Sequence, residues 1–233
     1  MADTARRSWD RSFFLVMAML AMVAIVLGFR TTIDENLIHP DWPRPLLLWI
    51  HAALFAAWIP LFVAQTALIR FRQVLWHRRV GAWALIVGIA IPILGLAATL
   101  IMAHLRALRG EADAAGFLPI GVTDMLAFAL AFGLAARFRA KRELHRRLMF
   151  IATCVLAAAG FLRLLQPILP GPYPGFLGAA VLMLLGVARD LFVDRRVHAI
   201  YVVALPLYVV AETAAVHLST DPSWLRLGSE LIR

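Results

Sequence analysis

Apolar residues fill long stretches of this chain and are not interleaved with polar ones as in a soluble fold. The clearest stretch is Leu46–Ile69, LLLWIHAALFAAWIPLFVAQTALI, which contains no charged residue. At 1.5 Å per residue, a helix of about 24 residues crosses a hydrocarbon core of about 30 Å. The pattern therefore predicts a transmembrane helix over this stretch.

Other apolar stretches repeat this pattern along the chain. We predict seven spans, over residues 12–29, 46–69, 82–105, 119–136, 147–166, 175–193 and 197–218. The first is too long for the apolar region of a signal peptide, so we expect it to be retained. In the tail, Asp221 and Pro222 resemble a helix cap, and an apolar side follows, as in a short interfacial helix. The fold class predicted is all-α: a polytopic membrane bundle (1–218) followed by a short interfacial C-terminal helix (219–233).

Composition agrees with a membrane protein. The chain has 233 residues, of which 62% are hydrophobic and 16% charged, and its mean hydropathy is +0.81. A soluble domain is about 45–50% apolar and about 25% charged. The single cysteine, Cys154, excludes an intrachain disulfide and any CxxC motif.

The net charge of +9 follows the predicted topology. Basic residues favour cytoplasmic loops, and 16 of the 23 lie on one side of the predicted membrane, against 6 on the other. This split predicts a cytoplasmic N-terminus and an external C-terminus. The partners expected are the lipid bilayer, anionic lipid at the cytoplasmic rim and a membrane protein, with no nucleic acid. The first side carries Arg6, Arg7, Arg11, Arg70, Arg72, Arg78, Arg79, Arg137, Arg139, Lys141, Arg142, Arg146, Arg147, Arg189, Arg195 and Arg196; the second carries Arg30, Arg44, Arg106, Arg109, Arg226 and Arg233.

Two hairpins share a motif. The motif is LWHRRVGAW in one hairpin and ELHRRLMFI in the other, and both put His-Arg-Arg at the cytoplasmic start of the returning helix, with His77 and His145 at matching positions. Two hairpins of the same sense predict a four-helix core of two repeats over residues 46–166. The arginines of the His-Arg-Arg motifs could also contact anionic headgroups.

Ionisable residues inside the spans point to a site. His51, Asp124 and Glu212 each lie about six residues, or roughly 8–9 Å, below the external surface. An ionisable group costs about 2.5–3.5 kcal/mol or more at the bilayer centre, so we predict that these three face a common pocket. His51 also shares a helix face with Trp58 and Gln65, at spacings of seven. Further candidates near this level are His104, Arg163, Gln166, Tyr208 and His217.

These residue types fit several chemistries. His51, His104, Asp124 and Glu212 would suit a transition metal ion, and histidines on facing helices can ligate haem iron. The same acid and base groups also fit a proton-coupled carrier of a small solute. Two simpler interpretations stay open, in which Asp124 caps its helix and Glu212 pairs with Arg163. No motif assigns an enzyme class, and a non-catalytic membrane subunit is a further possibility.

The segments HAALFAAWIPLFVAQT, HRRVG and ELHRRLMFIAT resemble a group of bacterial multi-pass inner-membrane proteins. The core of that group is similar to the four-helix haem and oxidase-assembly proteins of respiratory membranes. The resemblance implies a bacterial inner-membrane location, a redox or respiratory-assembly role and haem or metal binding, with His51, His77 and His145 as cofactor ligands. Seven-span zinc hydrolases are similar in topology, and the similarity implies a metal-dependent membrane hydrolase as an alternative.

Overall fold

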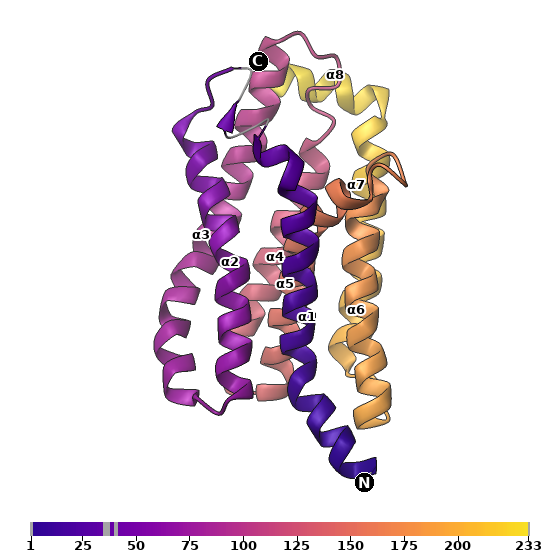
Figure 1. Cartoon of the computed structure of the whole chain (residues 1–233). Coiled ribbons are helices and arrows are strands. Elements are labelled where there is room, and N and C mark those ends of the chain that lie inside the picture. The colour runs from indigo at the N-terminus through magenta and orange to yellow at the C-terminus, as the bar shows by residue number, and fades with distance from the viewer. Residues whose placement is uncertain (1, 35–37, 40–41, 233) are drawn as a thin grey trace.

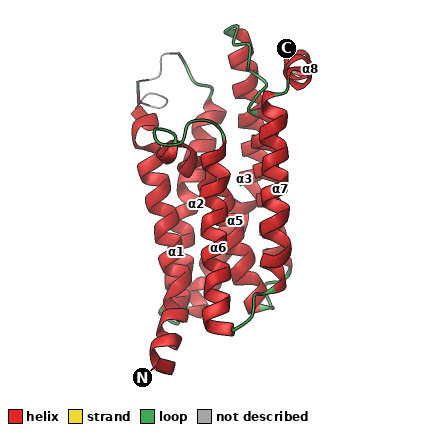
Figure 2. Ribbon diagram, turned by 90° about the vertical axis from the view of Figure 1, so that its right-hand side faces the viewer, coloured by secondary structure: helices red, strands yellow, loops and turns green. Residues whose placement is uncertain are grey.

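We describe a computed structural model of the chain, covering residues 2–34, 38–39 and 42–232, without the side chains of residues 2–9, 11 and 31. Arg233 and the side chains of Arg6, Arg7 and Arg11, all counted above for orientation, lie outside the described part. The described residues form helices and loops, with no strand. The helices are α1 (Ala2–Ile33), α2 (Leu46–Arg70), α3 (Val74–Leu108), α4 (Leu118–Arg137), α5 (Arg142–Leu165), α6 (Tyr173–Asp194), α7 (Ala199–Thr220) and α8 (Pro222–Leu231) (Figures 1 and 2).

The seven predicted spans are confirmed as helices long and apolar enough to cross a membrane, α1 to α7. Three helices begin at least five residues earlier than predicted: α1 at Ala2 and not at residue 12, α3 at Val74 and not at residue 82, and α5 at Arg142 and not at residue 147. The His-Arg-Arg motifs lie within the first turns of α3 and α5, at the helix starts where they were predicted. Their charged side chains interrupt the apolar pattern without ending the helix, because Arg and Lys are good helix formers.

Helix α5 lies at the centre of the bundle. It packs against α1, α4, α6 and α7, and Trp58 of α2 reaches it by donating a hydrogen bond to Thr153 at 3.3 Å. The other six helices surround it in the order α1, α2, α3, α4, α7, α6. Helix α5 is the most buried of the seven spans. Its first turns carry charged residues such as Arg146 and Arg147, and a central place keeps such groups away from lipid.

Small residues allow close packing around α5. Gly28 of α1 faces Gly160 of α5, and a Cβ atom on Gly28 would collide with the Gly160 carbonyl oxygen. On the other side of α5, Gly178 of α6 lies against the ring of Phe161. Backbones come this close in membrane bundles where both helices carry small residues at the crossing.

The outer surface of the bundle is apolar. Large apolar side chains are exposed along helix after helix; on α3 and α7 they include Trp83, Ile86, Ile93, Val202, Val203 and Val210. A surface of this kind is stable against hydrocarbon and not against water. The chain is therefore a multi-pass membrane protein.

The two ends of the bundle differ. We call the end that holds the start of α1 and the α2–α3, α4–α5 and α6–α7 hairpins the basic end, and the other the opposite end. The termini lie at different ends, and α8 lies across the opposite end (Figure 1). Helix α8 starts at a side-chain cap, because Asp221 Oδ1 accepts from the backbone N–H groups of Ser223 (2.8 Å) and Trp224 (3.1 Å).

Candidate functional site

The polar face of α2 turns into the bundle. Trp58 is buried, and its ring meets Phe128 and Phe132 of α4 edge-on, with centroids 5.3 and 5.7 Å apart. Gln65 is also buried and lies against His77 of α3. The middle of this face therefore forms the packed core, and only its His51 end is free for other chemistry.

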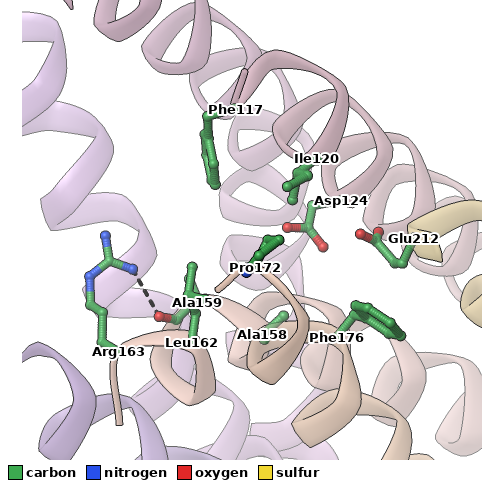
Figure 3. Close-up of a pocket in the computed structure, with 11 residues that line it drawn as sticks. Phe117, Ile120, Asp124, Ala158, Ala159, Leu162, Arg163, Pro172, Phe176 and Glu212 are labelled. Carbon is green, nitrogen blue, oxygen red and sulfur yellow. Dashed lines mark hydrogen bonds between the residues drawn. The ribbon is translucent and has the colours of Figure 1, made fainter. Parts of the chain in front are cut away.

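Asp124 and Glu212 meet inside the bundle. Asp124 comes from α4 and Glu212 from α7, and their carboxyl groups point toward one another (Figure 3). Two carboxyl groups placed in this way can share one proton, whereas two ionised carboxylates would repel each other. Asp124 Oδ1 and Glu212 Oε1 are shielded from solvent and have no partner among the described residues.

A small cavity borders the carboxyl pair. Its volume is about 40 Å³, and a cavity of about 10–15 Å³ or more can hold a water molecule. The walls are mainly apolar, with the two carboxyl groups and Arg163 as the charged lining (Figure 3). The rest of the lining is Phe117, Ile120, Ala158, Ala159, Leu162, Pro172, Gly175 and Phe176.

Both simpler interpretations of these acids are excluded. Helix α4 begins at Leu118, so Asp124 lies in its second turn and does not cap it. Arg163 points away from the pair (Figure 3), donates to the Ala159 carbonyl at 2.8 Å and lies 4.1 Å from the centroid of the Phe29 ring. No ion pair joins Arg163 to Glu212, although the structure describes both residues.

The histidines near the opposite end do not join the pair. His51 packs on Phe55 of the same helix, with ring centroids 4.2 Å apart. Its Nδ1 atom is buried and has no partner among the described residues. His104 Nδ1 lies 2.6 Å from the Ile232 carbonyl oxygen, and His217 is exposed in the last turn of α7.

Of the four metal ligands predicted, the structure thus brings together Asp124 and Glu212 only. Across the described ranges, no three or more His, Cys, Asp or Glu side chains form a group that could hold a metal ion. Of the supporting residues, Tyr208 is buried on α7 and Gln166 is exposed at the end of α5. Metal and haem binding stay predictions.

The histidines of the two motifs lie at the basic end, half-buried. His77 lies against Gln65 of α2, and His145 Nδ1 lies 2.9 Å from the Ala135 carbonyl oxygen. The arginines beside them differ in environment: Arg78 and Arg79 are exposed, whereas Arg147 is buried. Only the first motif therefore offers both of its arginines to headgroups.

The basic end contains a buried group of charges that the sequence analysis missed. Arg147 of α5 donates to Asp190 of α6 at 2.7 and 2.9 Å, and Arg189 donates to the same carboxylate at 2.7 Å. All three side chains are at least 98% buried. The full group, called the charge cluster below, is Asp10, Glu143, Arg146, Arg147, Arg189, Asp190 and Asp194.

The charge cluster joins four helices. Arg189 pairs with Asp10 of α1, and Asp194 accepts from both Arg147 (2.8 Å) and Arg189 (2.6 Å). The backbone N–H of His198, at the start of α7, donates to Asp190 at 3.1 Å. Burial, and secondarily the nearby Arg147 charge, lower the pKa of His198, whose neutral ring accepts from the Ile200 N–H.

The sequence held a signal for the charge cluster. Arg189 and Asp190 lie within the predicted sixth span, and Asp194 follows Asp190 at helical spacing. We had counted Arg147 and Arg189 as topological charges because each lies close to a predicted span end. An acidic residue beside an arginine inside a span indicates burial and pairing, because neither charge is stable against lipid.

Fold and site together define the class: a polytopic helical membrane protein with a carboxyl pair inside its bundle and a buried charge cluster at its basic end. No family model matches the chain, and neither the curated proteins nor the solved structures include a significant match.

Proposed function

We propose that this protein is a proton-coupled carrier of a small solute, with Asp124 and Glu212 as its proton-binding site. The observation that carries this proposal is the pair of facing carboxyl groups, which borders a cavity inside a membrane bundle and has no ion-pair partner among the described residues. Ionisable residues facing the interior of a membrane bundle commonly form proton or ion pathways.

The pair can change its charge without a large rearrangement. With one shared proton it carries a single negative charge, and with a second proton it is neutral. A neutral pair is cheaper to enclose in a low-dielectric bundle than a charged one. Proton binding would therefore favour a conformation in which the pair is fully enclosed, which is how a carrier couples a proton to movement.

Three helices of the bundle, including α7, contain an internal proline. Pro60, Pro92 and Pro206 lie inside α2, α3 and α7. A proline inside a helix removes one backbone hydrogen bond and permits bending. Because α7 carries both Pro206 and Glu212, a bend in this helix would move one member of the pair relative to the other.

Proton flux in liposomes tests the proposal. Purified protein is reconstituted with a pH-sensitive dye inside, and a potassium diffusion potential drives proton entry. We expect flux from the native protein, and a fall to the level of protein-free liposomes for Asp124→Asn and for Glu212→Gln, since an amide cannot release a proton. The control is Glu230→Gln, which neutralises an exposed acid on α8. Native-like flux in both pair variants would refute the proposal.

A second measurement reports on the proton without requiring flux. A lipid-soluble carbodiimide reacts with protonated carboxyl groups in apolar surroundings. We expect it to modify Glu212 or Asp124 in the native protein, and expect peptide mapping to show no adduct at either position in the Asp124→Asn/Glu212→Gln double variant.

One observation favours a second candidate, a redox or assembly protein that binds haem or a metal through His51. The buried Nδ1 of this ring has no partner among the described residues. An unpaired ring nitrogen of this kind can bind a metal ion. An absorbance spectrum and metal analysis of the purified protein test this candidate; a signal lost in His51→Ala would support it, and its absence from the native protein would remove it.

A further inference from the structure

Two buried tyrosine hydroxyls need an explanation. Tyr201 and Tyr208 lie on α7, and both are at least 96% buried. Neither hydroxyl has a hydrogen-bond partner among the described residues. Buried polar groups are nearly always paired, because an unpaired one loses its hydration without compensation.

The two tyrosines share a helix face with Glu212, because the residues are spaced by seven and four. Tyr208 precedes Glu212 by about one helical turn, so it lies next to the carboxyl pair. Cys154 of α5 is buried in the same core cluster as both tyrosines. This face therefore leads from the carboxyl pair toward the basic end.

The same face ends at the charge cluster. Tyr201 lies in the first turn of α7, three residues after His198, whose backbone N–H donates to Asp190. Its hydroxyl lies directly over Gly186 of α6, where a Cβ atom would collide with it. Gly186 and Asp190 are one helical turn apart. A line of polar groups thus connects the two charged sites through the middle of the bundle.

The two ends of this line differ in access. At the carboxyl pair, the line meets the cavity of about 40 Å³. At the basic end, it meets side chains that pair across α1, α5 and α6 and bind the start of α7. Separation of these helices would break ion pairs whose members Arg147, Arg189 and Asp190 are nearly inaccessible to solvent.

We infer that the charge cluster is the gate of a water path at the basic end, and that Tyr201 and Tyr208 line this path up to the carboxyl pair. The inference rests on the proposed function. In the closed state described here, the hydroxyls are unpaired; when the gate opens, water enters and hydrogen-bonds to them. A carboxyl O–H bond then breaks, its proton passes to this water as hydronium and leaves at the basic end, and a carboxylate stays behind.

Cys154 is a native reporter for this gate. It is the single cysteine of the chain, it is fully buried, and it lies beside the line between the two tyrosines. The probe is a membrane-impermeant maleimide applied to sealed vesicles, either on the basic-end side or on the opposite side. In the native protein we expect slow labelling of Cys154 from the basic-end side and none from the other.

Asp190→Asn removes the carboxylate that both buried arginines share. We expect labelling from the basic-end side to rise by about a hundredfold or more, the change that losing one partner of a buried ion pair would produce in the open population. Labelling from the opposite side should stay at its native rate. The matched control is Glu111→Gln, which breaks the half-exposed Arg106–Glu111 pair (2.6 Å) outside the charge cluster, and leaves both rates unchanged.

Asp194→Asn keeps the test decisive if Asp190→Asn fails to fold. Asp194 is 35% exposed and also pairs with both arginines, so we expect a smaller rise in labelling with the same sidedness. Native-like labelling in folded variants, or equal labelling from both sides, would overturn the gate. If Glu212→Gln loses proton flux but Asp190→Asn leaves the labelling rate unchanged, the carrier proposal stands and the gate is refuted. If Asp190→Asn raises the labelling rate but the native protein shows no proton flux, the gate stands and the carrier proposal is refuted.

Discussion

Polar side chains of this protein obtain their partners in two ways. Asp221 finds its own within three residues, because its carboxylate accepts from the N–H groups that open α8. Asp190 depends on helices distant in sequence, since its partner Arg147 lies 43 residues away. A local partner follows from chain geometry alone, whereas a distant one exists only when the bundle is assembled.

Replacement of Asp221 by alanine tests the local kind. The backbone N–H groups hold the pKa of Asp221 below its ordinary 3.8. The cap therefore stabilises α8 fully at pH values above 3.8, and this stabilisation is lost as the pH falls through the lowered pKa of Asp221. At neutral pH we expect Asp221→Ala to speed hydrogen exchange at the Ser223 and Trp224 amides, and in strong acid we expect native and variant proteins to converge.

Glu230→Ala is the control for this prediction, because Glu230 is exposed in the same helix and does not cap it. Equal exchange in the native protein and in Asp221→Ala at neutral pH would show that the cap does not stabilise α8.

Counting residues from the span ends placed side chains at a common depth, but it did not predict how each helix is rotated about its axis. Asp124 and Glu212 were expected to meet because each lies about six residues below the same surface, and they do meet. His51 was placed at the same depth, yet its ring packs on Phe55 of its own helix and does not line the cavity beside the pair. Depth follows from a constant rise per residue. The direction of a side chain depends on the rotation of its helix, which all neighbouring helices set together.

At the scale of elements, α5 organises the bundle. Its polar and small residues would be poor against lipid, and they suit a helix with neighbours on every side. The spans themselves were predictable because an apolar run of sufficient length has few other stable states in a membrane. The central place of α5 was harder to predict, since small residues indicate close packing without naming the partner.

The crossing of α1 and α5 gives a test at this scale. Gly160 has no room for a methyl group, because the backbone and side chain of Ile25 lie against it. We expect Gly160→Ala to destabilise the bundle by about 1–3 kcal/mol, as overpacking does in a dense core. The measurement is the unfolding free energy of the purified protein in mixed micelles of increasing denaturing detergent.

Gly133 of α4 is the matched control, since nothing lies within 4 Å of a Cβ atom built there. Gly133→Ala should stabilise the protein by about 0.5–1 kcal/mol, because alanine has less conformational freedom to lose than glycine in a helix. A Gly160→Ala variant as stable as Gly133→Ala would mean that α1 and α5 do not approach as closely as described.

At the scale of the whole molecule, the two sites divide the bundle between its ends. The carboxyl pair borders a cavity nearer the opposite end, and the charge cluster closes the basic end. The line of Tyr208, Cys154 and Tyr201 joins them. Because the two ends of the bundle differ, the orientation of the protein in the membrane decides which compartment exchanges protons with the carboxyl pair.

The basic residues predict that direction. Most of the described Arg and Lys residues at the helix ends lie at the basic end, and such residues are retained in the cytoplasm. We therefore expect an epitope tag at the N-terminus to be protected, and one at the C-terminus to be removed, when a protease is added to intact cells. Inside-out vesicles are the control and should give the reverse. Removal of both tags from intact cells would contradict seven crossings, whereas removal of the N-terminal tag alone would place the charge cluster at the outer surface and the cavity toward the cytoplasm.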